Sequence, residues 1–141
     1  MTYYRTGYVP GVFDLPHRGH LNLLRAARSH CACLIVGVVT DEGTLAYKGR
    51  RPVQDELTRF ELLRSLRIVD DVMMQATTDP TPNLEVLRPD ALFHGDDWTE
   101  LREGHETLRR LGIAYVTVPY TPGVSTSRLI AQMVERGMAT T

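Results

Sequence analysis

Apolar and polar segments alternate at short intervals along this chain. Apolar runs that are typical of strands lie at 7–12, 34–39, 69–74, 91–94 and 113–118. Segments with the spacing of helices lie at 21–28, 55–66, 83–87, 99–111 and 125–136. This order predicts a single doubly wound, Rossmann-like α/β domain, in which helices cover both faces of a five-stranded parallel sheet.

The polar segments between these elements are expected to gather at one edge of the sheet. In open α/β sheets, ligands bind beyond the carboxyl ends of the strands, where the strand order reverses. Residues 40–43 are expected to end the second strand, and residues 47–53, which are basic and contain glycine and proline, are expected to form a loop. The segments 95–98 and 120–123 also lie at such ends, so this edge is the predicted ligand site.

Composition narrows the class of protein. With 141 residues, 43% of them hydrophobic, residues 1–141 are expected to form one domain with one core. The net charge of -1 argues against binding of nucleic acid or an anionic membrane, and no apolar stretch of about 20 residues predicts a membrane span or a secretion signal. Cys31 and Cys33 lie at the start of an apolar run, where burial is expected rather than a disulfide. Free cysteines are typical of a reducing cytoplasm, which is the expected location. Two cysteines alone provide too few ligands for a zinc site.

Two histidines stand three residues apart directly after the first predicted strand. His17 and His20 flank Gly19, where the chain is expected to enter a helix. The start of a helix offers unpaired backbone N–H groups and the positive end of its dipole, and both suit phosphate. Two imidazoles there can donate hydrogen bonds to phosphoryl oxygens and stabilise charge in a transition state. The alternative is that the histidines merely cap or pack the helix start.

These features give the chain a family resemblance. Five motifs carry it, in this order: Phe13-Asp14 with His17-x-Gly19-His20, the basic segment Lys48–Arg51, Arg67-Ile68-Val69-Asp70, Gly95-Asp96-Asp97-Trp98, and Gly123-Val124-Ser125-Thr126-Ser127. With them the chain resembles the cytidylyltransferase family of small nucleotidyltransferases, particularly the bacterial glycerol-3-phosphate type. The basic segment and the segments 81–84 and 89–90 also look like the adenylyltransferases that act on heptose phosphates, a sister group.

The resemblance implies a reaction. A phosphate or phosphonate oxygen of a small acceptor would attack the α-phosphorus of CTP, release pyrophosphate and leave a CDP-linked product. The protein would contribute positioning and charge stabilisation rather than covalent chemistry. Mg²⁺ would arrive with the triphosphate and need few dedicated protein ligands. The resemblance also implies a homodimer.

The resemblance implies roles for individual residues as well. The catalytic set is His17, His20, Lys48 and Arg50, and Lys48 with Asp41 would contact the acceptor. The nucleotide-binding set is Val12, Phe13, Asp14, His17, Gly19, His20, Arg67, Gly95, Asp96, Asp97, Tyr120, Thr121, Gly123, Val124, Ser125, Thr126 and Ser127. Alternatives remain for several members: a solvated loop for Lys48 and Arg50, an ion pair with Asp70 or Asp71 for Arg67, and helix capping for one of the three final hydroxyls.

The sequence departs from the family pattern at two places. Tyr120 stands where many members carry arginine, and a tyrosine cannot supply a permanent positive charge. Residues 77–81 contain no basic residue, although the glycerol-phosphate enzymes use a lysine there. Three hypotheses therefore remain: a CTP-dependent cytidylyltransferase, an ATP-dependent adenylyltransferase acting on a sugar phosphate, and a nucleotide-binding module without catalysis.

Overall fold

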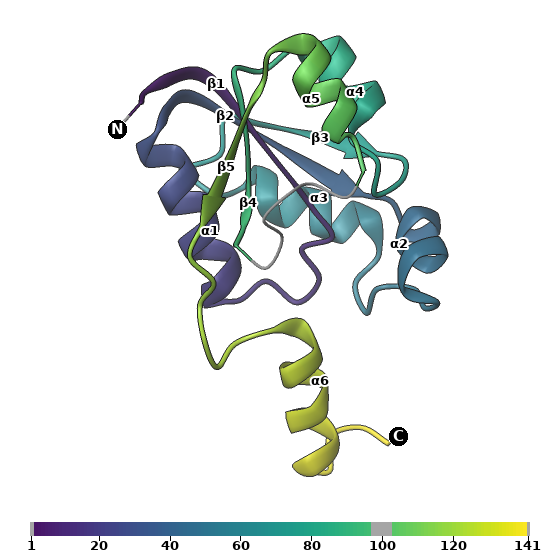
Figure 1. Ribbon diagram of the computed structural model, residues 1–141. Coiled ribbons are helices and arrows are strands. Elements are labelled where there is room, and N and C mark those ends of the chain that lie inside the picture. The colour runs from purple at the N-terminus through teal and green to yellow at the C-terminus, as the bar shows by residue number, and fades with distance from the viewer. Residues whose placement is uncertain (1, 97–102, 141) are drawn as a thin grey trace.

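The computed structural model describes residues 2–96 and 103–140. Its centre is a parallel sheet of five strands in the order β3-β2-β1-β4-β5, which places β1 in the middle (Figure 1). The strands are β1 Tyr4–Gly11, β2 Cys31–Val39, β3 Asp71–Gln75, β4 Ala91–Gly95 and β5 Ala114–Val118. The predicted doubly wound α/β architecture is confirmed, and the strand order reverses between β1 and β4.

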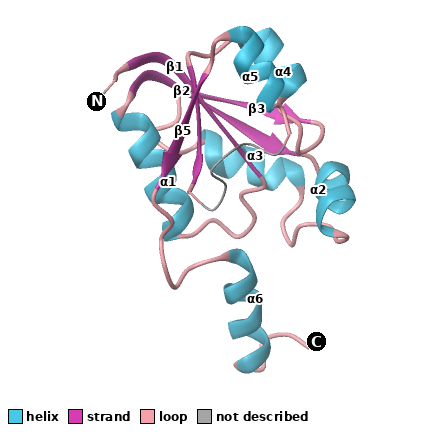
Figure 2. Cartoon of the chain, viewed as in Figure 1, coloured by secondary structure: helices cyan, strands magenta, loops and turns pink. Residues whose placement is uncertain are grey.

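Helices cover both faces of the sheet (Figure 2). They are α1 Arg18–Ser29, α2 Asp41–Lys48, α3 Glu56–Arg64, α4 Thr81–Leu87, α5 His105–Leu111 and α6 Thr126–Glu135. Alternate residues of the strands feed two apolar clusters, because successive side chains of a strand point to opposite faces. Val9 packs with Leu24 of α1 and Leu63 of α3, whereas its neighbour Tyr8 packs with Leu84 of α4 and Leu108 of α5.

Helix α6 is attached differently from the other helices. In Figure 1 it stands apart from the layers around the sheet, with the C-terminus at its far end. None of its residues is fully buried, in contrast to α1, where Leu24 and Ala27 are. Its residues are at most partly buried, and Leu129, Gln132 and Met133 line a shallow pocket together with Leu15, Pro16 and Gln54.

Helix α2 corrects the prediction for residues 40–53. Residues 41–48 are helical rather than strand end and loop, so Lys48 closes a helix. The Thr40 side chain caps this helix by accepting a hydrogen bond from the N–H of Gly43 (3.0 Å). Gly43 lies inside this helix and does not end it. The residue is glycine because a Cβ at this position would lie 2.4 Å from the carbonyl oxygen of Ala76. The helix ends at Lys48, and the residue that caps it, Gly49, has a φ of 75°.

Other boundaries shift by a few residues. The first strand starts at Tyr4 instead of residue 7, and the third at Asp71 instead of residue 69. The described part of the helix predicted at 99–111 begins at His105, and residues 99–102 lie outside the described residues. That helix ends as expected, because Gly112 adopts a φ of 67°.

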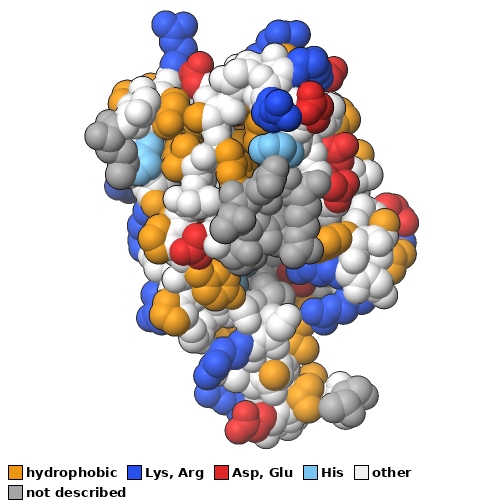
Figure 3. All heavy atoms as spheres, in the orientation of Figure 1, with side chains coloured by type: hydrophobic (Ala, Val, Ile, Leu, Met, Phe, Trp, Pro, Cys, Tyr) orange, Lys and Arg blue, Asp and Glu red, His pale blue; other side chains and the backbone are white. Residues whose placement is uncertain are grey.

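Both cysteines are free, with Cys31 buried and Cys33 partly buried. Over residues 2–96 and 103–140, no helix is long and apolar enough to cross a membrane, and no group of three or more histidine, cysteine or acidic side chains is placed to hold a metal ion. On the face drawn in Figure 3, acidic and basic side chains are interspersed. Any anion-binding site on this face is therefore local.

Candidate active site

A cavity of about 340 Å³ opens at the carboxyl ends of β1, β4 and β5, between the start of α1 and the start of α6. Most of the residues proposed from the sequence line it: Val12, Phe13, Asp14, His17, Gly19, His20, Lys48, Gly95, Tyr120, Thr121, Val124, Ser125, Thr126 and Ser127. The sequence reasoning missed further lining residues, namely Pro10, Gly11, Leu23, His94, Val118 and Pro119. Gly11 and Val118 are the last residues of β1 and β5, so the rule that ligands bind beyond the carboxyl ends of strands could have found them.

The loop between β1 and α1 has an unusual backbone. Phe13 has a φ of 55° and Leu15 a φ of 48°. Residues other than glycine rarely adopt such positive values. The buried ring of Phe13 covers the backbone of Gly11, where a Cβ would lie 2.8 Å from Phe13 Cε2. Such strained conformations persist only where the surrounding contacts fix them, and they cluster at functional sites.

The two histidines cap α1 with one ring nitrogen each. Nδ1 of His17 accepts a hydrogen bond from the N–H of Gly19 (3.0 Å), and Nδ1 of His20 accepts one from the N–H of His17 (3.2 Å). The rings are stacked, with 3.8 Å between their centroids. Because each Nδ1 acts as an acceptor, each neutral ring carries its proton on Nε2. Capping and phosphate binding are thus compatible, since capping leaves the Nε2–H of each ring available as a donor.

The site keeps these imidazoles neutral. Burial, with the nearby charges of His17 and Lys48, lowers the pKa of His20 from 6.5 to about 3. Burial also lowers the pKa of His17. Near pH 7 the pair therefore provides hydrogen-bond donors to a phosphate without positive charge. The positive charge at this wall comes from Lys48, although desolvation and the adjacent Arg50 lower its pKa and Asp14 opposes that shift.

Asp14 joins three parts of the site. Its buried carboxylate accepts hydrogen bonds from the N–H groups of Val53 (2.7 Å) and Gln54 (2.9 Å). Its carbonyl oxygen accepts one from the Thr126 hydroxyl at the start of α6 (2.7 Å). Within the described residues, no hydrogen bond links the carboxylate to a histidine. Asp14 therefore holds the segment 53–54 and α6 against the histidine loop.

Arg59 is a further organising residue that the sequence reasoning missed. Its side chain is 0% exposed and donates to the carbonyl oxygens of Gln54 (2.9 Å), Val12 (2.8 Å) and Val39 (2.7 Å). It also pairs with Asp41 at 2.7 Å. The guanidinium thus satisfies carbonyl groups where β1 and β2 end. The signal in the sequence was its spacing, because Arg59 lies four residues before the buried Leu63 on the same helix face.

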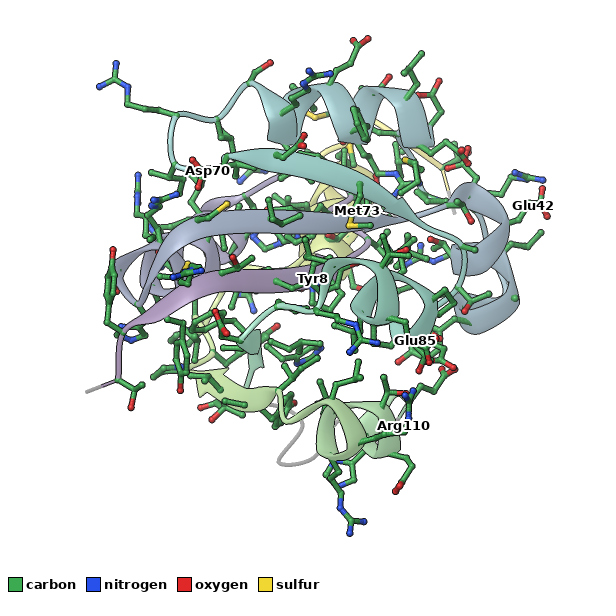
Figure 4. The ribbon with its side chains drawn as sticks, turned by 90° about the horizontal axis from the view of Figure 1, so that it is seen from above. Tyr8, Glu42, Asp70, Met73, Glu85 and Arg110 are labelled. Carbon is green, nitrogen blue, oxygen red and sulfur yellow. The ribbon has the colours of Figure 1, made fainter. Side chains whose placement is uncertain are left out.

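The structure does not bring every proposed residue into the cavity. Asp41 is held by Arg59 and lies outside the lining, which favours a structural role over acceptor binding. Arg67 is exposed ahead of β3, at the amino edge of the sheet, and is removed from the nucleotide-binding set. The alternative, an ion pair of Arg67 with Asp70 or Asp71, is not recorded within the described residues, and Asp70 pairs with Arg28 instead. Figure 4 shows Asp70 and Glu42 of α2 at opposite ends of the strands.

Four more proposed residues lie beside the cavity or outside the described residues. Arg50 is exposed just after Gly49 and does not line the cavity, and Gly123 is likewise outside the lining. Asp96 supports the wall indirectly, because its carboxylate accepts a hydrogen bond from the backbone N–H of Tyr120 (3.0 Å). Asp97, with Trp98 of the same motif, lies outside the described residues.

The first turn of α6 forms the wall that faces the histidines. Ser125 caps the helix, its hydroxyl accepting a hydrogen bond from the N–H of Arg128 (3.0 Å). Thr121, just before this turn, accepts a hydrogen bond from the Asn22 amide of α1 (3.0 Å). Free N–H groups and the hydroxyl of Ser127 at this helix start are suited to phosphate oxygens. The cavity is thus bounded by the amino ends of two helices.

Comparison with known proteins identifies the family. The model of the cytidylyltransferase-like family matches residues 8–132. The chain belongs to this nucleotidyltransferase family. It is 38% identical over 128 residues to the bifunctional protein HldE of Bradyrhizobium sp. (strain ORS 278), a match that covers 89% of this chain and 26% of that protein. The HldE of Rhodopseudomonas palustris (strain BisB18) is 40% identical over 130 residues, 91% of this chain and 26% of the relative. The chain thus spans only about a quarter of these relatives.

Solved structures share the fold. The lipopolysaccharide core biosynthesis protein of Thermoplasma volcanium has a TM-score of 0.70 and 27% identity, over 84% of this chain and 97% of that one. The pantothenate synthetase of Thermus thermophilus has a TM-score of 0.63 at 19% identity, over 94% of this chain and 66% of the other, and shows likeness of fold alone.

Proposed function

We propose that this chain transfers a nucleoside monophosphate from a nucleoside triphosphate to a phosphate oxygen of a small acceptor, with release of pyrophosphate. The observation that carries the proposal is the pair of neutral imidazoles whose Nδ1 atoms are engaged in capping α1. This arrangement leaves two Nε2–H donors on the wall of a cavity that also receives the start of α6. A fixed set of donors is what stabilises charge that develops on a phosphoryl group.

The chemical step needs no covalent bond to the protein. An oxygen of the acceptor phosphate attacks the α-phosphorus, the bond to the bridging oxygen of pyrophosphate breaks, and the electron pair leaves with pyrophosphate. The Nε2–H groups of His17 and His20 donate to oxygens of the α-phosphoryl group. Lys48 lies on the wall beside Asp14 and draws the acceptor phosphate toward the triphosphate. The protein's contribution is therefore orientation and charge stabilisation.

Mg²⁺ is proposed to enter with the triphosphate. Asp14 is the carboxylate in the described lining, and both of its oxygens accept backbone hydrogen bonds. These residues fit an ion held mainly by phosphate oxygens and not a site built by the protein. No step above depends on a protein-bound metal.

A sugar phosphate with ATP is the favoured pair of substrates. The relatives named above are HldE proteins, and a similar solved structure is described as a lipopolysaccharide core biosynthesis protein. The segments 81–84 and 89–90 independently resemble adenylyltransferases of heptose phosphates. CTP with a small phosphorylated alcohol or a phosphonate is the second candidate, and the motif Gly95-Asp96-Asp97-Trp98 favours it. A homodimer is proposed for either pair on the family resemblance.

Pyrophosphate release by the purified chain tests both candidates. The chain is incubated with Mg²⁺, with ATP or CTP, and with a panel of sugar phosphates, alcohol phosphates and phosphonates, and each product is identified by mass. We expect the highest turnover with ATP and a sugar phosphate. A clear preference for CTP would select the second candidate. Tight nucleotide binding without pyrophosphate across the panel would contradict catalysis and leave a binding module.

A further inference from the structure

The side chain of Tyr8 crosses the sheet from β1 and ends in a buried hydroxyl. Tyr8 is 0% exposed, and β2 separates its strand from β3, as Figure 4 shows with Tyr8 and Met73. A Cβ at Gly37 of β2 would lie 1.8 Å from Tyr8 Oη, so the hydroxyl can pass over this strand only where the residue is glycine. A phenylalanine would fill the same apolar cluster without a polar atom. The contacts of the hydroxyl, and not packing alone, therefore account for a tyrosine at this position.

The hydroxyl joins three elements through two amide side chains. It donates a hydrogen bond to Oε1 of Gln75, the last residue of β3 (2.6 Å), and accepts one from Nδ2 of Asn83 in α4 (3.0 Å). Gln75 Nε2 donates to the carbonyl oxygen of Thr77 (2.9 Å), and Asn83 Nδ2 donates to that of Met74 (2.9 Å). Burial raises the pKa of the Tyr8 hydroxyl, so it remains a donor near pH 7. Because a buried polar network with its groups paired holds one arrangement, Tyr8 fixes the carboxyl end of β3.

The first turn of α2 lies against this end of β3. The N–H of Thr40 donates to the carbonyl oxygen of Gln75 (2.9 Å), and its hydroxyl donates to that of Ala76 (2.9 Å). The backbone of Gly43 approaches the same Ala76 oxygen closely. Helix α2 is eight residues long and ends at Lys48, which lines the cavity. A shift at the start of this short helix is therefore expected to move Lys48.

Helix α2 is attached to two different elements. The ion pair of Asp41 with Arg59 ties its first turn to α3. The contacts with Gln75 and Ala76 tie the same turn to β3. A functional side chain is held precisely when the element that carries it is fixed by supporting contacts of this kind.

We propose that Tyr8 is a positioning residue for the proposed transfer, and that its hydroxyl acts through Gln75 and α2 to place Lys48 at the acceptor phosphate. The inference rests on the proposed function, which assigns the acceptor phosphate to Lys48. Tyr8 is fully buried and lies outside the cavity lining, so it acts only through these contacts. A displacement of about 1 Å in a group that orients a substrate is enough to slow a reaction.

The variant Tyr8→Phe tests this role, because it removes the hydroxyl and keeps the ring. Steady-state kinetics use the preferred nucleotide and the sugar phosphate that gives the highest turnover, at a temperature at which circular dichroism shows the variant to be folded. We expect KM for the sugar phosphate to rise about fivefold or more, which is the effect of one buried hydrogen bond. Calorimetric affinity for the nucleotide should stay within about twofold, because the donors assigned to the triphosphate lie on other elements.

Amide hydrogen exchange separates positioning from general loosening of the core. In Tyr8→Phe the amides of α2 should exchange about fivefold faster or more, while those of α1 stay within about twofold. A merely structural role predicts equal acceleration in both helices and equal losses of affinity for both substrates, and this result would contradict the inference. Asn83→Ala is a second, milder variant, since it keeps the hydrogen bond between Tyr8 and Gln75. It should give the same pattern with smaller changes, and it decides the question if Tyr8→Phe does not fold.

Tyr4→Phe is the matched control, since it makes the same chemical change at the other end of β1. The Tyr4 ring packs against Phe93, and no hydrogen bond of its hydroxyl is recorded within residues 2–96 and 103–140. This variant should leave both kinetic constants and the exchange of α2 within about twofold. An equal rise of KM in Tyr4→Phe and Tyr8→Phe would overturn the role of the Tyr8 hydroxyl.

The outcomes distinguish the two proposals. If the parent chain releases no pyrophosphate with any pair of substrates, the proposed function and the role of Tyr8 are both overturned. If the parent chain releases pyrophosphate but Tyr8→Phe keeps the parent's KM for the sugar phosphate, the proposed function stands and the inference about Tyr8 is wrong.

Discussion

At each end of the strands an arginine joins neighbouring segments. We call these ends the carboxyl edge and the amino edge of the sheet, and the two arginines differ in how far they are exposed to solvent. At the carboxyl edge, Arg59 is 0% exposed and its guanidinium binds three carbonyl oxygens and Asp41. At the amino edge, the side chain of Arg28 is 30% exposed and that of its partner Asp70 is 45% exposed. One guanidinium is sealed inside the protein, and the other is partly hydrated.

The difference reflects what each edge must hold. At the carboxyl edge, the chain leaves β1 and β2 to form the histidine loop and α2, so the carbonyl groups of Val12 and Val39 need a donor from elsewhere. At the amino edge, the Asp70 carboxylate accepts a hydrogen bond from the N–H of Leu34 (2.7 Å), and Arg28 binds the carbonyl oxygen of Ile68 (3.3 Å). The edge that carries the candidate site is therefore fixed by buried polar contacts.

The largest effect is expected from loss of the buried guanidinium. Arg59→Met leaves three carbonyl groups and Asp41 without their donor, and we expect unfolding to become easier by about 3 to 5 kcal/mol. Denaturation by urea measures the change. Arg28→Met is the matched variant and is expected to cost at most about 1 kcal/mol, because its ion pair is partly hydrated. Equal losses would contradict the contrast between the edges.

The histidines at the carboxyl edge are expected to affect turnover more than stability. His17→Asn retains a good N-cap acceptor, and His20→Gln retains a residue that can reach the N-cap backbone. Both remove an imidazole Nε2–H, so we expect turnover to fall ~100-fold. Steady-state kinetics and thermal unfolding are measured together. His30→Asn at the other end of α1 is the control and should retain normal turnover. Full turnover in both site variants would exclude the proposed role.

Acid is expected to destabilise the carboxyl edge through His20. The folded protein holds the pKa of His20 at about 3, below its usual 6.5, so the unfolded chain binds the proton first. Its contribution to stability is present above pH 6.5 and is lost as the pH falls toward 3, with a slope of up to about 1.4 kcal/mol per pH unit. Urea denaturation at several pH values measures this slope. It should be reduced in His20→Gln, and an unchanged slope would argue against a buried neutral imidazole.

The smallest effect is expected at the amino edge. The hydrogen bond from the N–H of Leu34 lowers the pKa of Asp70 below its ordinary value of 3.8, and the contact with Arg28 lowers it further. Asp70→Asn is expected to cost about 1 kcal/mol or less near pH 7 and to leave turnover unchanged, because Asp70 is partly exposed and far from the cavity. The stability that Asp70 contributes is lost as the pH falls below 3.8. Asp41→Asn at the other edge should cost more, and the reverse order would contradict the comparison.

Local patterns of apolar residues were sufficient to predict most of the strands and helices. The run at 34–39 and the helical spacing at 21–28 predicted β2 and α1, because apolar periodicity follows directly from burial on one face or both. The pattern failed at α2, where Gly43 has the appearance of a stop. Its reason for being glycine is a close approach to Ala76, and contact between distant segments leaves no local signal.

The arginines show a similar limit. The motif around Arg67 directed attention to a residue that lies at the far edge of the sheet. Arg59 belongs to no quoted motif and yet organises the ends of β1 and β2. Whether an arginine side chain is exposed or buried depends on which segments pack against it. That packing follows from the order of the strands in the sheet and not from the local sequence.

The sequence by itself determined the alternation of strands and helices, the pair of histidines after the first strand, and the hydroxyls at the start of the last helix, because each follows from residue type and spacing along the chain. The tertiary structure decided that the two Nδ1 atoms cap α1, that Arg59 and Asp41 are joined, and that the starts of α1 and α6 bound one cavity. These features arise from burial and from contacts between segments far apart in the chain, and burial is a property of the assembled fold.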